Sequence, residues 1–175
     1  MFFNPFLLDL TAAFFAVLST VLASLRIRSS WLLSFVACGI YTVIFFSKSL
    51  YFNLGIHAIY LPISVYGAVK WYAKPMSEQP IRFTQRSTLA ALASFFLLGL
   101  ACFSQLGPTL TLDYTTSYLS IAAMILMSHQ LIECWILWIL ADLIYIKLYM
   151  SSHMYFSMVK SCGYLLVASF SYYHW

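Results

Sequence analysis

Seven apolar segments, each long enough to cross a lipid bilayer as a helix, govern what this chain can fold into. A helix needs about 20 mostly apolar residues to span the hydrocarbon core of a bilayer. Hydrophobic residues make up 63% of the 175 residues and charged residues only 8%, which is more apolar surface than a soluble domain of this size can bury. The segments also lack the alternation that barrel strands require. The sequence therefore predicts an all-α membrane protein. Its seven transmembrane helices are expected at roughly 6–25, 31–47, 50–72, 87–105, 111–128, 131–150 and 154–174.

The chain also repeats itself at a spacing of 104 residues. Residues 9–71 align with residues 113–175 without a gap, and 15 of the 63 aligned positions are identical, far more than chance gives for this composition. Each repeat holds three helices, and the single helix between them restores the chain direction, so the repeats run parallel. Parallel repeats are a transporter architecture, with the substrate held between the halves. The predicted parts are a first three-helix bundle at 1–72, a cytoplasmic loop and linker helix at 73–108, and a second three-helix bundle at 109–175.

Most basic residues are predicted to lie on one side of the membrane. With alternating spans, six of the nine Lys and Arg fall in loops of that side: Arg26, Arg28, Lys70, Lys74, Arg82 and Arg86. Short loops rich in Lys and Arg stay in the cytoplasm. The protein is therefore expected in the cell (inner) membrane, with its N-terminus on the outer side and its C-terminus in the cytoplasm. On the outer side, Asp9 and Asp113 are interpreted as matching N-caps of the first and fifth helices, a structural role.

The sixth segment carries the most distinctive chemistry. Trp135, Trp138, Asp142, Tyr145 and Tyr149 are spaced three, four, three and four apart, which places them on one stripe of a helix. A carboxylate in a lipid-embedded helix is costly and normally faces a cavity or a partner. An aromatic face beside an anion suits a flat, cationic organic molecule. The alternative is an interfacial tryptophan belt with one paired aspartate.

The second repeat is the more polar of the two. Lys160 stands where the first repeat has Ile56, and Asp142 stands where it has Cys38. The sixth and seventh helices run antiparallel from a turn near Ser152, so at about 1.5 Å per residue Asp142 and Lys160 lie at similar depth. An unpaired charge there is unfavourable, and the two are expected to pair directly, through water or through substrate.

The first repeat offers fewer polar groups. Asn53 is a candidate substrate contact, or it caps the turn before the third helix. His57 is interpreted as a hydrogen-bonded packing residue, with a ligand contact as the alternative. Tyr66, nearer the inner end of the same helix, is a further candidate contact.

No catalytic or metal-binding pattern is present, so the chain is not expected to be an enzyme, to hold a metal or to need a cofactor. The four histidines share no ligand spacing, the four cysteines form no Cys-x-x-Cys pair, and no glycine-rich nucleotide fingerprint occurs. The net charge of +4 resides in short loops between apolar segments, which does not indicate nucleic-acid binding.

Two motifs resemble those of a known family. Glu133-x-Trp135-x-x-Trp138-x-x-x-Asp142 resembles the sixth-helix motif of the PnuC family of nicotinamide riboside transporters, usually Glu-Asn-Trp-x-x-Trp. In the third helix, Tyr66-Gly67 with Trp71 is similar to the family's Tyr-Gly-Trp-x-x-Trp. Two positions depart from these patterns and remove groups that could contact substrate: Cys134 replaces the Asn, and Ala68 replaces the first Trp.

The resemblance covers nearly the whole chain and implies a function. It implies a 3+1+3 fold like that of a full-length SWEET transporter, and uncoupled diffusion of a vitamin that a cytoplasmic kinase then traps. Trp135 and Trp138 would enclose the aromatic ring, while Glu133, Asn53 and Asp142 would supply polar contacts. Related family members are thought to carry thiamine or riboflavin, and thiamine is also a flat cation.

Two other classes of protein remain as alternatives. The substrate-binding subunit of an energy-coupling-factor vitamin importer is also small and helical, but the parallel repeat and the Trp-x-x-Trp motif argue against it. A membrane scaffold has no need for Asp142 and Trp138 on one helix face. The expected partners are therefore a small cationic vitamin and the lipid bilayer, with a homo-oligomer left open.

Overall fold

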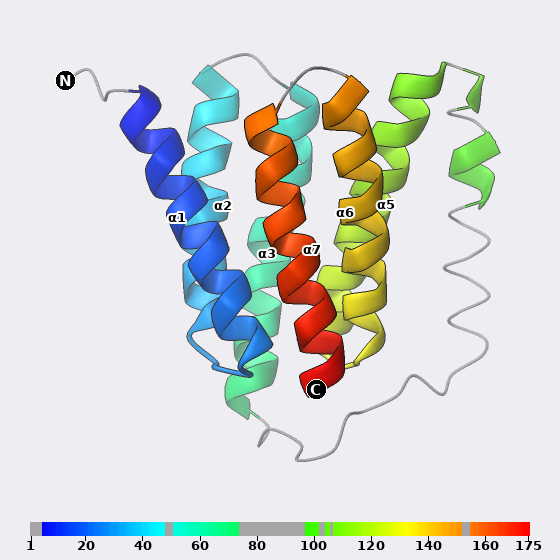
Figure 1. Ribbon diagram of the computed structural model, residues 1–175. Helices are drawn as coiled ribbons and strands as arrows, with labels where there is room; N and C mark the ends of the chain where they lie inside the picture. Colours follow the sequence, from blue (N-terminus) through cyan, green and yellow to red (C-terminus); the bar gives the residue numbers. More distant parts are fainter. Residues whose placement is uncertain (1–4, 48–50, 74–96, 102–103, 106, 152–154) are drawn as a thin grey trace.

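Six helices make up most of the computed structural model, which describes residues 5–47, 51–73, 97–101, 104–105, 107–151 and 155–175 (Figure 1). The helices are α1 (Pro5–Ser24), α2 (Ser30–Ser47), α3 (Tyr51–Ala73), α5 (Pro108–Ser128), α6 (Glu133–Ser151) and α7 (Tyr155–His174). Most of the helix predicted at 87–105 lies outside the described residues, although 97–101 are helical. The described part of the chain contains no strand, and the all-α prediction is confirmed.

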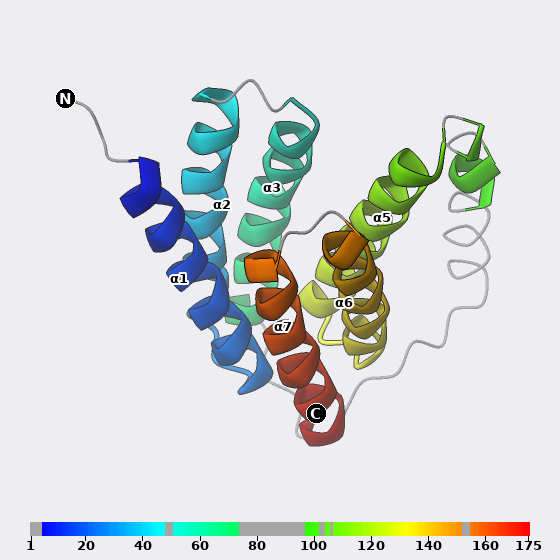
Figure 2. The same ribbon diagram turned by 45° about the horizontal axis from the view of Figure 1, so that its top comes forward.

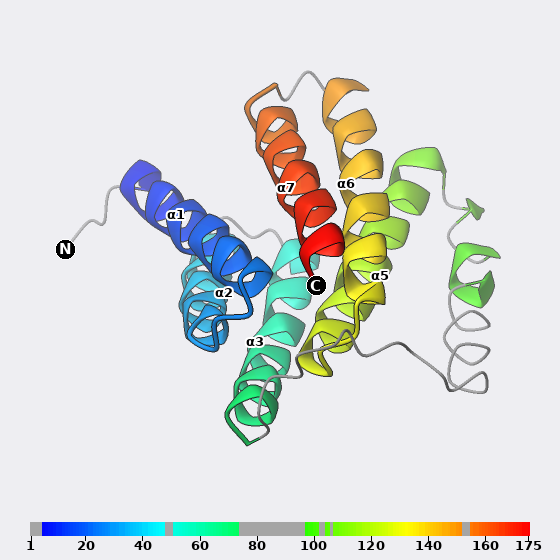
Figure 3. The same cartoon turned by 60° about the horizontal axis from the view of Figure 1, so that its bottom comes forward.

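The six helices form two groups of three. Along the chain, α1 packs on α2 and α2 on α3, and α5 packs on α6 and α6 on α7. Figures 2 and 3 show the two groups side by side, with α1, α2 and α3 on one side and α5, α6 and α7 on the other. They meet where α3 packs on α5 and where α1 packs on α7. We call these groups the first and the second bundle.

The helices expose apolar side chains outward and bury polar ones. Windows at Leu7–Ser24 and Ser30–Ser47 have mean hydropathies of 1.9 and 1.8, high enough to cross a membrane by composition alone. In α6 the outward residues Leu140 and Leu143 are 44% and 50% exposed, whereas Asp142 is 5% exposed. Apolar surface of this kind suits lipid, while buried polar groups in membrane helices face the protein interior.

The turn after α1 recurs after α5, 104 residues later. Arg26 and Gln130 have φ angles of +58° and +61°, and they are the non-glycine residues with positive φ in the described chain. In each turn the following N–H donates to the carbonyl five residues earlier: Ile27 to Leu22 at 2.8 Å, and Leu131 to Leu126 at 3.1 Å. This is the Schellman arrangement, which normally uses glycine at the left-handed position. The two bundles thus reverse direction through the same backbone geometry.

Candidate substrate cavity between the bundles

A cavity of about 770 Å³ lies between the bundles, with side chains from all six described helices on its walls. That volume is typical of sites that enclose small organic molecules. Helices α1, α3, α5 and α7 all end near the basic residues Arg26, Arg28 and Lys70, and we call this the basic end. The opposite end, where α1 and α5 begin, is called the acidic end for the carboxylates described below.

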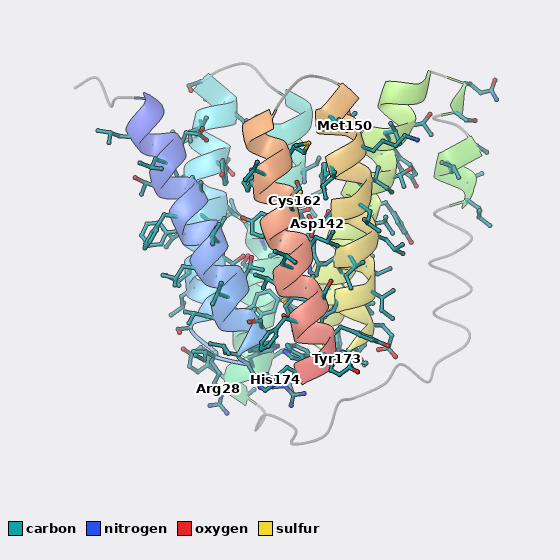
Figure 4. The ribbon with its side chains drawn as sticks, viewed as in Figure 1. Arg28, Asp142, Met150, Cys162, Tyr173 and His174 are labelled. Carbon is teal, nitrogen blue, oxygen red and sulfur yellow. The ribbon has the colours of Figure 1, made fainter. Side chains whose placement is uncertain are left out.

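Four of the five residues of the stripe predicted on the sixth helix line this cavity, and the side chain of the fifth, Tyr149, lies outside the described residues. Trp135, Trp138, Asp142 and Tyr145 all line it, and so does Lys160 of α7. Figure 4 shows Asp142 part of the way along the helices, between the labelled residues of the two ends. The 3.6-residue period of a helix therefore gathers two indoles, a phenol and a carboxylate on one wall.

Asp142 and Lys160 are close enough to attract each other electrostatically. Lys160 is also near enough to Asp9 of α1 for electrostatic attraction, so carboxylates of both bundles act on it. A buried charge in this environment requires such a partner, since its desolvation is otherwise uncompensated. The lysine therefore links one carboxylate from each bundle.

The interpretation of Asp9 and Asp113 as helix caps is wrong. Pro5 begins α1 and Gly107 is the N-cap of α5, so each aspartate lies more than one turn inside its helix. Proline suits the first turn because its missing N–H is not needed there. Both carboxylates line the cavity instead. The cavity therefore holds three carboxylates (Asp9, Asp113 and Asp142) and one ammonium (Lys160), a net negative charge of two in their ordinary ionised forms.

Hydroxyl groups cover the wall formed by α5. Thr116, Ser117 and Ser120 line the cavity or its edge, whereas the matching positions of α1 are alanines: Ala12, Ala13 and Ala16. The hydroxyl of Thr116 donates to the Leu112 carbonyl at 3.0 Å, and that of Ser117 donates to the Asp113 carbonyl at 2.6 Å. Thr116 and Ser120 also interact with the Tyr145 side chain, which leaves Ser117 as the α5 hydroxyl with an acceptor oxygen to offer a ligand.

Aromatic rings of the first bundle form the opposite wall. The His57 ring lies 5.2 Å from Tyr41, 4.9 Å from Phe45 and 5.5 Å from Tyr60, measured between centroids. All four residues line the cavity. His57 thus packs within an aromatic group and also lines the cavity, so the packing role and the ligand contact both stay predictions.

Three predicted contacts are not placed on the cavity wall. Tyr66 is 43% exposed, its hydroxyl oxygen lies 3.1 Å from His129 Nε2, and it is not among the lining residues. Glu133 begins α6 near the basic end and is also not among them. The side chain of Asn53 lies outside the described residues.

Four tryptophans gather at the end of the cavity nearer the basic end. Ring centroids are 5.6 Å apart for Trp31 and Trp71, 5.3 Å for Trp135 and Trp175, and 6.1 Å for Trp71 and Trp175. The first two pairs are edge-to-face, the geometry that aromatic quadrupoles prefer. We call these four residues the tryptophan cluster. In the 104-residue repeat, Trp31 aligns with Trp135 and Trp71 with Trp175, whereas the sequence prediction for Trp135 is a substrate contact.

Metal binding finds no support in the described part of the chain. It contains no group of three or more His, Cys, Asp or Glu side chains that could hold a metal ion. Cys38, Cys134 and Cys162 are free thiols.

Comparison with known proteins adds two findings. The family model described as "Nicotinamide mononucleotide transporter" matches residues 6–175. A solved structure, described as "Crystal structure of the Vitamin B3 transporter PnuC", is similar with a TM-score of 0.75 and 21% sequence identity, over 96% of this chain and 80% of that chain. At this identity the likeness shows a shared fold. The comparison with curated proteins gave no match.

Proposed function

The chain belongs to the nicotinamide mononucleotide transporter family, and we propose that it carries nicotinamide riboside across the cell membrane by uncoupled diffusion. The observation that carries this choice is the wall of α6, where Trp138 and Asp142 face one cavity. A pyridinium ring is flat and positively charged, so an indole face and a carboxylate are complementary to it.

The charge of the cavity favours a riboside over a nucleotide. Asp9, Asp113 and Asp142 outnumber the single ammonium of Lys160. A phosphate monoester would bring about two negative charges into this environment, where like charges in a low dielectric repel strongly. A riboside lacks that group and keeps the favourable cation.

The two walls of the cavity give the substrate an orientation. The hydroxyl of Ser117 on the α5 wall suits a ribose, whose own hydroxyls donate hydrogen bonds to acceptor oxygens. The nicotinamide ring would then lie toward Trp138, on the neighbouring helix of the same bundle.

We further propose that the basic end faces the cytoplasm and that a kinase there traps the vitamin after entry. The positions of Arg26, Arg28 and Lys70 at one end support this orientation, since Lys and Arg stay on the cytoplasmic side. A reporter fused to the C-terminus that is active only outside the cytoplasm would contradict it.

Purified protein in liposomes tests the substrate. Labelled nicotinamide riboside is expected to exchange across the membrane without an ATPase or an ion gradient, and nicotinamide mononucleotide is expected to compete poorly. Exchange of thiamine instead would keep the cationic, aromatic site and change the vitamin. No exchange of either compound would overturn the proposal. If transport required an added ATPase, the protein would instead be the substrate-binding subunit of an energy-coupling-factor importer.

A further inference from the structure

We propose that the tryptophan cluster is the gate that closes the cavity at the basic end, and that two indole hydrogen bonds are its latch. This inference rests on the transport role of the chain but not on which vitamin it carries.

The cluster lies where such a gate must lie. Trp31 and Trp135 line the cavity, whereas Trp71 and Trp175 do not. Trp71 and Trp175 come from the ends of α3 and α7, so they form a second layer between the cavity and the basic end. The four residues are between 0% and 6% exposed, so no solvent reaches the rings through this layer.

The latch joins the two bundles twice, in a matching way. The indole N–H of Trp71 in the first bundle donates to the Met127 carbonyl of α5 at 3.1 Å. The indole N–H of Trp175 in the second bundle donates to the Ser24 carbonyl of α1 at 3.0 Å. A site between two bundles opens when the bundles part at one end, and parting at the basic end breaks both bonds.

Charged and small residues support the closed position. The Arg26 guanidinium carbon lies 5.1 Å from the Trp175 ring centroid, and its Nη2 donates to the Trp175 carbonyl. On the other side, a Cβ built on Gly67 would lie 2.4 Å from Trp31, so glycine makes room for that ring. These contacts hold the Trp31 and Trp175 rings in defined positions.

The cavity-facing layer is not fully satisfied when the gate is closed. The indole N–H groups of Trp31 and Trp135 are buried and, like that of Trp138, have no hydrogen-bond partner among the described residues. A buried donor without a partner disfavours the closed arrangement relative to one that admits water or a substrate acceptor.

Cys38 provides a native reporter for the gate. Its thiol lines the cavity, on the cavity side of the cluster. With Cys102, Cys134 and Cys162 replaced by alanine, a membrane-impermeant methanethiosulfonate reagent is added to proteoliposomes from one side at a time. Trp71→Phe combined with Trp175→Phe keeps the rings and removes both latch donors. Labelling of Cys38 from the basic side should accelerate about fivefold for each bond removed, or roughly thirtyfold in the double variant.

The side of entry distinguishes gating from loosening. Labelling from the acidic side should stay unchanged, and Tyr173→Phe, which removes a hydroxyl at the same end from a side chain that is 94% exposed, should change neither rate. An unchanged rate from the basic side overturns the proposal, and so does an equal acceleration from both sides. The single variant Trp71→Phe gives the same comparison with a smaller perturbation. Because the assay needs no substrate, its failure is separate from failure of nicotinamide riboside exchange.

Discussion

The two bundles share their turns and their tryptophan packing, which we call the frame, but they differ in the residues that line the cavity, which we call the lining. They share the left-handed turn after the first helix, and they share the tryptophan pairs that meet at the basic end. At the cavity wall they differ: the second bundle presents Trp138, Asp142 and Lys160 where the first presents Ser34, Cys38 and Ile56. The matched positions form the structure that both halves need, while the unmatched positions bear the chemistry that a single asymmetric ligand requires.

This comparison also separates two roles within one motif. Trp135 and Trp138 are one turn apart on α6, yet Trp135 is fully buried against Trp175, and Trp138 is only partly buried. Trp31 matches Trp135 in the first bundle, whereas Ser34 stands at the position of Trp138. We therefore propose that Trp135 acts chiefly in packing between the helices and that Trp138 contacts the ligand.

The largest effect is expected from Asp142→Asn. Asp142 is 5% exposed and lines the cavity, so Asn at this position removes the negative charge proposed to attract both Lys160 and the cationic ring. Nicotinamide riboside exchange should fall by at least about a hundredfold. Cys38→Ser, at the matching position of the first bundle, should change exchange less than threefold, a change under about 1 kcal/mol. Equal losses in the two variants would show that the asymmetry is not functional.

The pair itself is tested by adding Lys160→Met to Asp142→Asn. The double variant should unfold at a higher temperature than Asp142→Asn alone, because the uncompensated ammonium is gone. Thermal unfolding followed by tryptophan fluorescence measures this. Independent, additive effects of the two substitutions would count against the pairing.

A smaller effect is expected from Trp138→Ala. A cation–π contact in a desolvated site contributes about 2 kcal/mol or more, so the affinity for nicotinamide riboside should fall roughly thirtyfold. The matched control is Ser34→Ala, which deletes a hydroxyl that lies 3.2 Å from the Ser64 hydroxyl. Titration calorimetry on the detergent-solubilised protein measures both. An affinity that survives Trp138→Ala would remove this indole from the site.

Gly67→Ala tests the frame instead of the lining. The new methyl group would collide with the Trp31 ring, and overpacking of this kind costs about 1–3 kcal/mol. Gly163→Ala places a methyl group where no atom lies within 4 Å, and it should leave the unfolding temperature unchanged or raise it slightly. A thermal unfolding temperature that does not drop in Gly67→Ala would mean that the Trp31 ring is not held against α3.

The smallest effect is expected from Ser117→Ala, which makes α5 resemble α1 at this position. Losing one neutral hydrogen bond costs about 1 kcal/mol, so riboside binding should weaken about fivefold. Binding of N-methylnicotinamide, which keeps the cationic ring but lacks the sugar, should not change. Ala13→Ser in the first bundle serves as the matched control. Equal weakening for both ligands would refute a sugar-binding role for the α5 wall.

Periodicity predicted the part of the site that lies on a single helix. The spacing of Trp135, Trp138, Asp142 and Tyr145 was enough to place them on one face, because that face follows from 3.6 residues per turn. The apolar segments likewise predicted the described helices within a few residues, because the length of a span is fixed by the bilayer.

Contacts between helices could not be predicted in the same way. Asp9 and Asp113 read as caps because aspartate favours that position, and only the starting points of α1 and α5 place them in the cavity. Tyr66 lies on α3, where polar residues are few and scattered, so no pattern distinguishes the outer face of that helix from its inner one. The tryptophan cluster requires two bundles to meet, and sequence spacing alone does not fix their mutual rotation.

The latch also bears on how the protein is inserted into the membrane. The Ser24 carbonyl accepts its hydrogen bond from the Trp175 indole, which is synthesised 151 residues later in the chain. At about 5–20 residues per second, roughly 8–30 s of synthesis separate the two halves of that bond. Meanwhile the end of α1 exists without its partner. Its place at the end of a membrane helix lets interfacial water hydrate that carbonyl, which hydrocarbon could not do. The hydrogen bond that forms last in synthesis therefore lies at the membrane interface, where water can satisfy the Ser24 carbonyl until Trp175 is made.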